Sequence, residues 1–236
     1  MLYLDYYLLG ILLLPGIILA AYAQWKVTHT FNKYKEIPSE SGKMAHEVAR
    51  MFLNYAGLQD VQIIKVRGRL TDYYNHRKKT LALSEATYNS TSISALGVAC
   101  HEVGHALQYK SRYFPIMIRN ILLPIVNFAQ YFVWILVIFG FVVFYMTSSM
   151  LWLWIAIAVF ASSTVIHLLT LPIEYNASKR SLQLLKDSTI LTPDETQQAK
   201  KVLGAAALTY VAGLLVSILN LLRFVIMILI RTKSRD

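Results

Sequence analysis

Cysteine and acidic residues are both scarce in this chain of 236 residues. Cys100 is the only cysteine, so no disulfide bond can form within the chain, and cysteine usage gives no sign of an oxidising compartment. Asp and Glu together number 13, against 23 Lys and Arg, and charged residues make up only 15% of the sequence. A hydrophobic share of 56% accompanies this shortage of charge, which excludes an ordinary soluble domain.

Long apolar runs account for the composition. They have about the 20 residues that a helix needs to cross a bilayer, and they lie at residues 1–23, 128–146, 151–171 and 203–230. The first run could be a cleaved signal peptide, but its start lacks basic residues and its length suffices to span. The sequence therefore predicts a mainly α membrane protein with about four transmembrane helices.

The segment 24–114 is polar and basic, and we predict that it forms a small α+β domain at the membrane surface. Its expected elements are an amphipathic helix over residues 39–55, short strands at 61–66, 70–74 and 80–83, and a helix over 92–109. A short sheet beside the last helix could offer its edge to an extended substrate, or it could only support the helix.

The second half of the chain should return to this surface. Residues 115–171 are too long for one straight span, and Asn120 and Pro124 predict a bent lead-in before a transmembrane hairpin. We then expect a helix within residues 172–202, a transmembrane or re-entrant helix over 203–230, and a basic tail at 231–236.

Lysine and arginine gather in the segments between the apolar runs, as the positive-inside rule describes. No nucleic-acid motif accompanies them, so we predict no nucleic-acid partner. The rule places the surface domain in the cytoplasm and the N-terminus outside. The basic tail would then lie outside, against the rule, unless the last run re-enters the membrane or lies flat.

His101, Glu102 and His105 form an H-E-x-x-H motif within the helix predicted at 92–109. Histidines four residues apart lie on one face of a helix, so both rings can reach one point. The surrounding residues are apolar, and buried polar side chains need partners. One zinc ion would supply them, since two imidazoles and a carboxylate suit zinc and keep a fourth position for water.

Glu102 faces a neighbouring direction of the same helix. There it can take a proton from the zinc-activated water as a general base, without being a ligand itself. The predicted chemistry is the hydrolysis of a peptide bond.

A third ligand is expected just after residue 171, because a hairpin that crosses the membrane twice returns the chain to the side of the motif. Glu174 is the acid nearest that point, and we predict it as the ligand; an ion pair with Lys179 or Arg180 is its alternative. His167 competes with it, but the two lie roughly 10 Å apart along a helix axis. We expect His167 to be a hydrogen-bonded core histidine or a group that supports a ligand.

Several short segments together resemble the bacterial membrane-bound neutral zinc metallopeptidases, and more distantly the gluzincins that include the prenyl-protein endopeptidases and the heat-shock membrane protease. The resemblance covers about residues 40–185 and rests on G-R-L-T-D-Y-Y at 68–74, L-S-E at 83–85, S-I-S-A at 92–95, H-E-V-G-H-A-L-Q at 101–108 and P-I-E-Y-N-A-S-K-R at 172–180. It implies a zinc-dependent membrane endopeptidase with His101, His105 and Glu174 as ligands and Glu102 as the base.

The chain departs from the family pattern at two places. D-H-Y-D-P-R is common in the family where this chain has D-Y-Y-N-H-R at 72–77, and an Asp is common at Asn176. These differences weaken a claim of a second metal or an acidic substrate pocket, and they leave the zinc triad untouched.

The resemblance also suggests a supporting role for Ser178, because the distant relatives often have there an Asp that orients a zinc histidine. Peptide hydrolysis further needs a group that stabilises negative charge on the substrate carbonyl. The sequence offers candidates without choosing among them: Tyr73, Tyr74, His76, Tyr175 and Arg180.

A zinc site at the ends of membrane spans would reach protein or peptide substrates near the bilayer of a bacterial cell. Two other classes stay open at this point. One is a non-catalytic scaffold or chaperone stabilised by zinc, which would need a fourth protein ligand. The other is a transporter, suggested by the polar residues Asn120, Asn127, His167 and Asn220 in or near the spans.

Overall fold

The structure is a computed structural model that describes residues 9–233. Residues 1–8, where the first predicted span begins, and residues 234–236, where the basic tail ends, lie outside the described residues.

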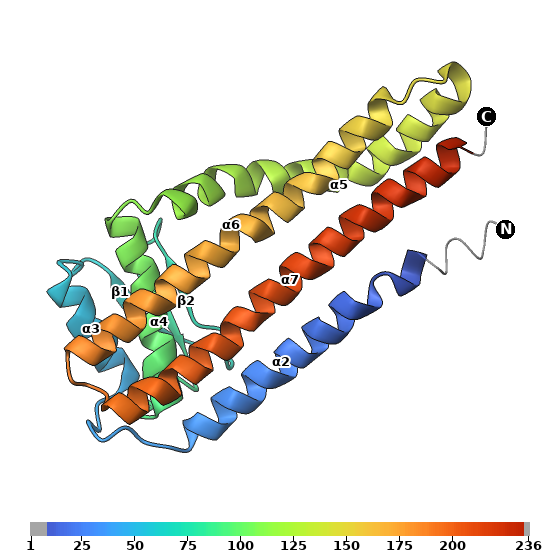
Figure 1. Cartoon of the computed structure of the whole chain (residues 1–236). Helices are drawn as coiled ribbons and strands as arrows, with labels where there is room; N and C mark the ends of the chain where they lie inside the picture. The colour runs from blue at the N-terminus through green and yellow to red at the C-terminus, as the bar shows by residue number, and fades with distance from the viewer. Residues whose placement is uncertain (1–8, 234–236) are drawn as a thin grey trace. The chain divides into compact units, whose positions relative to one another are not determined.

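Long helices dominate the described chain (Figure 1). Four of the described helices are long and apolar enough to cross a membrane. They are α2 (Leu14–Lys35, counted as a span from Leu9), α5 (Phe114–Thr147), α6 (Leu151–Asp187) and α7 (Pro193–Lys233). This confirms a mainly α membrane protein with a small α+β part.

Large apolar side chains on these helices point outward. On α5, Tyr131 is 82% exposed and Ile138 is 67% exposed. A soluble protein rarely leaves so many such side chains in water, whereas lipid is a suitable neighbour for them.

The helices differ from the predicted segments at their ends. The expected lead-in to the hairpin is the first part of α5, which continues through Pro124. α6 likewise continues through Pro172 into the surface segment and ends at Asp187, and α7 begins at Pro193. The segment 172–202 is thus parts of two helices, because helix-forming residues let both extend past their apolar runs. α7 has no break, which favours a full crossing over a re-entrant path.

The chain divides into two compact units. Of the described residues, 9–22, 118–171 and 210–233 form one unit, which we call the membrane unit, and 23–117 and 172–209 form the other, which we call the surface unit after the domain expected from the sequence. Within the membrane unit, a buried cluster of apolar side chains joins α5, α6 and α7, and its most enclosed members are Leu153, Ala156 and Ile228.

The surface unit is built around α4 (Ile93–Lys110), which packs against α3 (Ala45–Tyr55). α4 begins where the Ser92 hydroxyl accepts a hydrogen bond from the Ala95 amide. α3 buries the residues at helical spacing that its amphipathic pattern predicted, namely Ala45, Val48, Ala49, Phe52 and Leu53.

A three-stranded sheet lies beside α4 (Figure 1). β3 (Thr80–Ser84) is the central strand, with β1 (Gln62–Val66) parallel to it on one side and β2 (Tyr73–Asn75) antiparallel on the other. The strand predicted at 70–74 is therefore shorter and lies slightly later. β2 is an edge strand of the sheet, and it contacts α4.

Candidate metal centre

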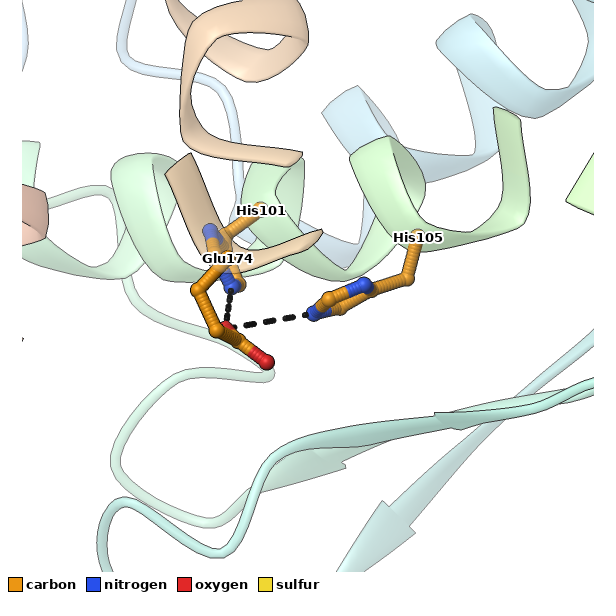
Figure 2. Close-up of side chains that lie close together, drawn as sticks. All are labelled: His101, His105 and Glu174. Atoms are coloured by element: carbon orange, nitrogen blue, oxygen red, sulfur yellow. Dashed lines mark hydrogen bonds and ion pairs between the residues drawn. The ribbon is translucent and has the colours of Figure 1, made fainter. Parts of the chain in front are cut away.

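His101 and His105 project from the same face of α4 toward one carboxylate. The two imidazole rings lie edge to face with centroids 4.8 Å apart. Their Nε2 atoms are 3.2 Å and 3.6 Å from the same oxygen, Oε2 of Glu174 on α6 (Figure 2). One ligand atom from each of the three residues lies within 4.8 Å of the other two, which is close enough for all of them to hold a single metal ion.

Glu174 reaches the histidines because α6 approaches α4 very closely at Gly104. A Cβ atom built on Gly104 would lie 2.5 Å from the carbonyl oxygen of Ala177, a distance that real Cβ atoms essentially never show. Ala177 is one turn after Glu174 on α6, so the two contacts belong to one interface. The glycine inside the motif therefore permits the helix contact that completes the group.

The other ring nitrogen of each histidine, Nδ1, also has a polar neighbour. His101 Nδ1 lies 3.1 Å from the Ser178 hydroxyl, and His105 Nδ1 lies 3.0 Å from Oε1 of Gln108. Contacts at Nδ1 orient both rings so that Nε2 faces Glu174. Ser178 was a candidate from the sequence, and its hydroxyl lies at Nδ1 of His101, whereas Gln108 was not among the candidates. Its spacing of three residues from His105 on one helix is the signal that could have found it.

Glu102 is buried beside the group, with 8% of its surface exposed. Burial raises the pKa of its carboxyl group; the neighbouring His105 and His101 oppose that rise, and the charges of Glu174 and Asp72 add to it. A carboxyl group with a raised pKa is suited to exchange protons near neutral pH.

His105 shows the opposite balance of causes. Burial of the ring lowers its pKa, but the hydrogen bond to Glu174 and the charges of Glu102 and Glu174 outweigh this effect and raise the pKa to about 9. In the metal-free protein His105 therefore carries a proton at neutral pH, and that proton competes with any metal for the ring.

The other candidates from the sequence make no hydrogen bond or ion pair with the three possible ligands within residues 9–233. Tyr74 and His76 line a pocket of about 420 Å³ together with Tyr109 on α4, where the His76 ring stacks on Tyr109 at 4.2 Å. Tyr73 on β2 and Tyr175 on α6 are exposed, by 47% and 54%.

Arg180 and His167 have other neighbours. The Arg180 Nε donates a hydrogen bond to Oδ1 of Asn176 at 2.8 Å, and its guanidinium lies over the Tyr113 ring. His167 belongs to the membrane unit, where a Cβ on Gly213 would lie 3.5 Å from its Nδ1. Arg180 thus has polar and aromatic partners in the surface unit, and His167 lies in the other unit.

Comparison with known proteins places this arrangement in a family. No solved structure matches the chain. The protein named "Putative membrane protease YugP" of Bacillus subtilis (strain 168) is 41% identical over 211 residues, which cover 89% of this chain and 92% of that protein. A family model described as "Putative neutral zinc metallopeptidase" matches residues 9–229. The chain therefore belongs to this family of zinc metallopeptidases, and it is a multi-pass membrane protein related to a membrane protease.

Proposed function

We propose that this protein is a membrane-embedded zinc endopeptidase that hydrolyses peptide bonds in membrane or membrane-proximal proteins. The observation that carries the proposal is the convergence of two imidazole nitrogens on one Glu174 oxygen, next to the buried carboxyl group of Glu102. The family and the membrane protease relative support it.

The donor set suits one zinc ion. Two neutral imidazoles and one carboxylate are a ligand set that catalytic zinc sites use, with a fourth position left for water. Within the described residues the group of possible ligands consists of His101, His105 and Glu174. Bound there, zinc supplies Lewis acidity that polarises a substrate carbonyl and makes water a stronger acid.

Glu102 moves the proton in the proposed reaction. Its carboxylate accepts a proton from the water whose oxygen attacks the carbonyl carbon of the scissile bond. As the carbon–nitrogen bond breaks, the same carboxyl group gives that proton to the leaving nitrogen. The raised pKa of Glu102 supports both halves of this exchange, since the group must take up a proton and then release it.

The course of α6 supports a substrate close to the bilayer. α6 passes from the membrane unit to the surface unit between Leu171 and Pro172, and Glu174 follows two residues after Pro172. The edge strand β2 contacts α4, so an extended peptide that pairs with β2 would run beside the helix that carries the motif.

We further propose that the surface unit faces the cytoplasm. Its two segments hold most of the Lys and Arg residues between the spans, in agreement with the positive-inside rule. Four spans then put the basic tail on the outer side, where Arg231 and Lys233 depart from the rule.

A scaffold or chaperone stabilised by zinc is the alternative. Structural zinc sites normally have four protein ligands, whereas the group within residues 9–233 has three. A scaffold also gives no reason to bury the carboxyl group of Glu102 beside the ligands. Both observations favour the enzyme.

The test is the substitution Glu102→Gln in detergent-purified protein, with casein and a solubilised single-span protein as substrates. We expect zinc content to stay at the wild-type level and cleavage to fall about 10²–10⁴-fold, the usual contribution of a general base. Glu36→Gln, at an exposed glutamate, is the matched control and should keep full activity. Cleavage by purified Glu102→Gln at the wild-type rate would rule out the mechanism, and a wild type that binds zinc without cleaving would favour the scaffold.

A further inference from the structure

Gln108 is a fully buried polar side chain on α4, one turn after His105. A buried amide must satisfy both its donors and its acceptor to avoid a cost in stability. Its amide nitrogen is 2.7 Å from the backbone carbonyl of Ile173 and 3.1 Å from Oδ1 of Asn176, both on α6. Its amide oxygen is 3.0 Å from Nδ1 of His105.

These partners fix which way the amide faces. The Ile173 carbonyl can only accept a hydrogen bond, so the Gln108 nitrogen must face α6 and the oxygen must face His105. Asn176 agrees with this assignment, because its Oδ1 also accepts from the Nε of Arg180, which can only donate. Two independent acceptors on α6 thus hold the amide in one orientation.

The orientation of Gln108 determines the orientation of His105. The amide oxygen can only accept, so Nδ1 of His105 carries a hydrogen and donates it. A neutral imidazole has a single N–H, which leaves the lone pair on Nε2, the atom that points toward Glu174. The ring is therefore presented to the metal through Nε2.

His101 has no comparable constraint. Its Nδ1 faces the hydroxyl of Ser178, which can rotate and either donate or accept. Ser178 is also only partly buried, so water can replace it. Gln108 thus requires Nδ1 of His105 to donate, whereas Ser178 lets Nδ1 of His101 either donate or accept.

We propose that Gln108 is a positioning residue that fixes His105 as a ligand through Nε2 and joins the turn of α6 that bears Glu174 to α4. The inference rests on the proposed function, since it concerns the same metal centre. Ile173 directly precedes Glu174, so one amide side chain acts on two of the three ligands.

The first measurement is the zinc Kd of the full-length protein by chelator competition, at constant pH. Gln108→Met keeps the length and burial of the side chain but removes its polar atoms, and we expect it to weaken zinc binding about 10–100-fold, as loss of a partner behind a metal ligand does. Asn176→Asp keeps both accepting bonds and should stay close to the wild-type Kd. Asn176→Leu removes one of the two acceptors and should weaken binding less than Gln108→Met.

The second measurement separates positioning from general destabilisation. In zinc-loaded protein labelled with ¹⁵N-histidine, we expect the Nδ1 proton of His105 to exchange slowly in the wild type and quickly in Gln108→Met. Ser178→Ala identifies the signals of the other ligand, His101, and should leave the His105 proton protected. A merely structural role would not change one ligand histidine selectively.

Some results would overturn only the role of Gln108, and one would also overturn the proposed function. Wild-type zinc affinity and a protected His105 proton in Gln108→Met would overturn the inference alone, and so would ligation of His105 through Nδ1 in the wild type. If Gln108→Met does not fold, an unchanged Kd in Asn176→Leu would overturn it. Absence of zinc binding in the wild type would overturn the proposed function and this inference together.

Discussion

The helices α4 and α6 contribute to the metal centre in opposite ways. α4 lies within the core of the surface unit, with Leu96 and Ala99 fully buried, and it brings two ligands from a local motif. α6 leaves the membrane unit with exposed apolar side chains such as Leu168, at 58%, and within the surface unit it buries Ile173 and Ala177. α4 therefore presents two of the three possible ligands from a buried helix, and α6 adds the third where it packs against α4.

The largest effect should come from removing the ligand that α6 contributes. Glu174→Ala should abolish tight zinc binding, lowering the metal content from about one per chain to near zero, because two imidazoles alone hold zinc weakly. His167→Ala is the matched control on the same helix and should keep its zinc. Metal analysis of detergent-purified protein decides between them: zinc that survives loss of Glu174 but not of His167 would mean that the third ligand is misassigned.

The next largest effect should come from keeping α6 from its close approach to α4 at Gly104. Gly104→Ala puts a methyl group against the Ala177 carbonyl, so we expect a loss of stability of about 1–3 kcal/mol together with much weaker zinc binding. Gly97→Ala makes the same change on the same helix, where the nearest atom, the Cβ of Ala199, is 3.5 Å away and space is adequate. That variant should be neutral or up to about 1 kcal/mol more stable, since Ala favours a helix over Gly.

Thermal unfolding and zinc Kd of the two glycine variants provide the measurement. Equal behaviour of the two would show that the close contact at Gly104 does not control the site.

The two helices also differ in how far the sequence alone predicts their parts of the site. The spacing of His101 and His105 is local, so helix geometry alone brings their side chains together. The apolar runs likewise predict the spans, because a bilayer requires a minimum length of apolar helix. Glu174 followed from counting membrane crossings, which needs no knowledge of packing.

Features that depend on helix contacts escaped prediction. The role of Gln108 requires the carbonyl of Ile173, a partner 65 positions away that only docking brings near. The helices also continue through Pro172, where the sequence suggested a boundary, and through Pro124, within the lead-in that was expected to bend. A proline removes one hydrogen bond within a helix, but packing and apolar surroundings on either side can maintain it. The contacts of Gln108 with α6 could therefore not be predicted from a local pattern.

The raised pKa of His105 on α4 gives a third prediction. His105 has a pKa of about 9 in the metal-free protein, so below that pH zinc must displace a proton from the ring. Zinc affinity should rise about tenfold per pH unit between pH 6 and 8 and level off above about 9. Calorimetry in two buffers of different ionisation enthalpy would report the release of about one proton at pH 7.5. An affinity independent of pH over this range would contradict a protonated His105.

The smallest expected effect comes from Ser178 on α6, whose hydroxyl contacts Nδ1 of His101. Ser178→Ala removes the hydroxyl behind His101, and we expect the zinc Kd to rise less than about 10-fold, the lower limit for such partners. The hydroxyl is partly exposed, so water can take its place at Nδ1. Ser178→Asp should instead tighten binding, because a carboxylate accepts more strongly from the ring. Chelator competition with both variants measures the two changes, and a loss in Ser178→Ala as large as that in Gln108→Met would mean that the two histidines are held alike.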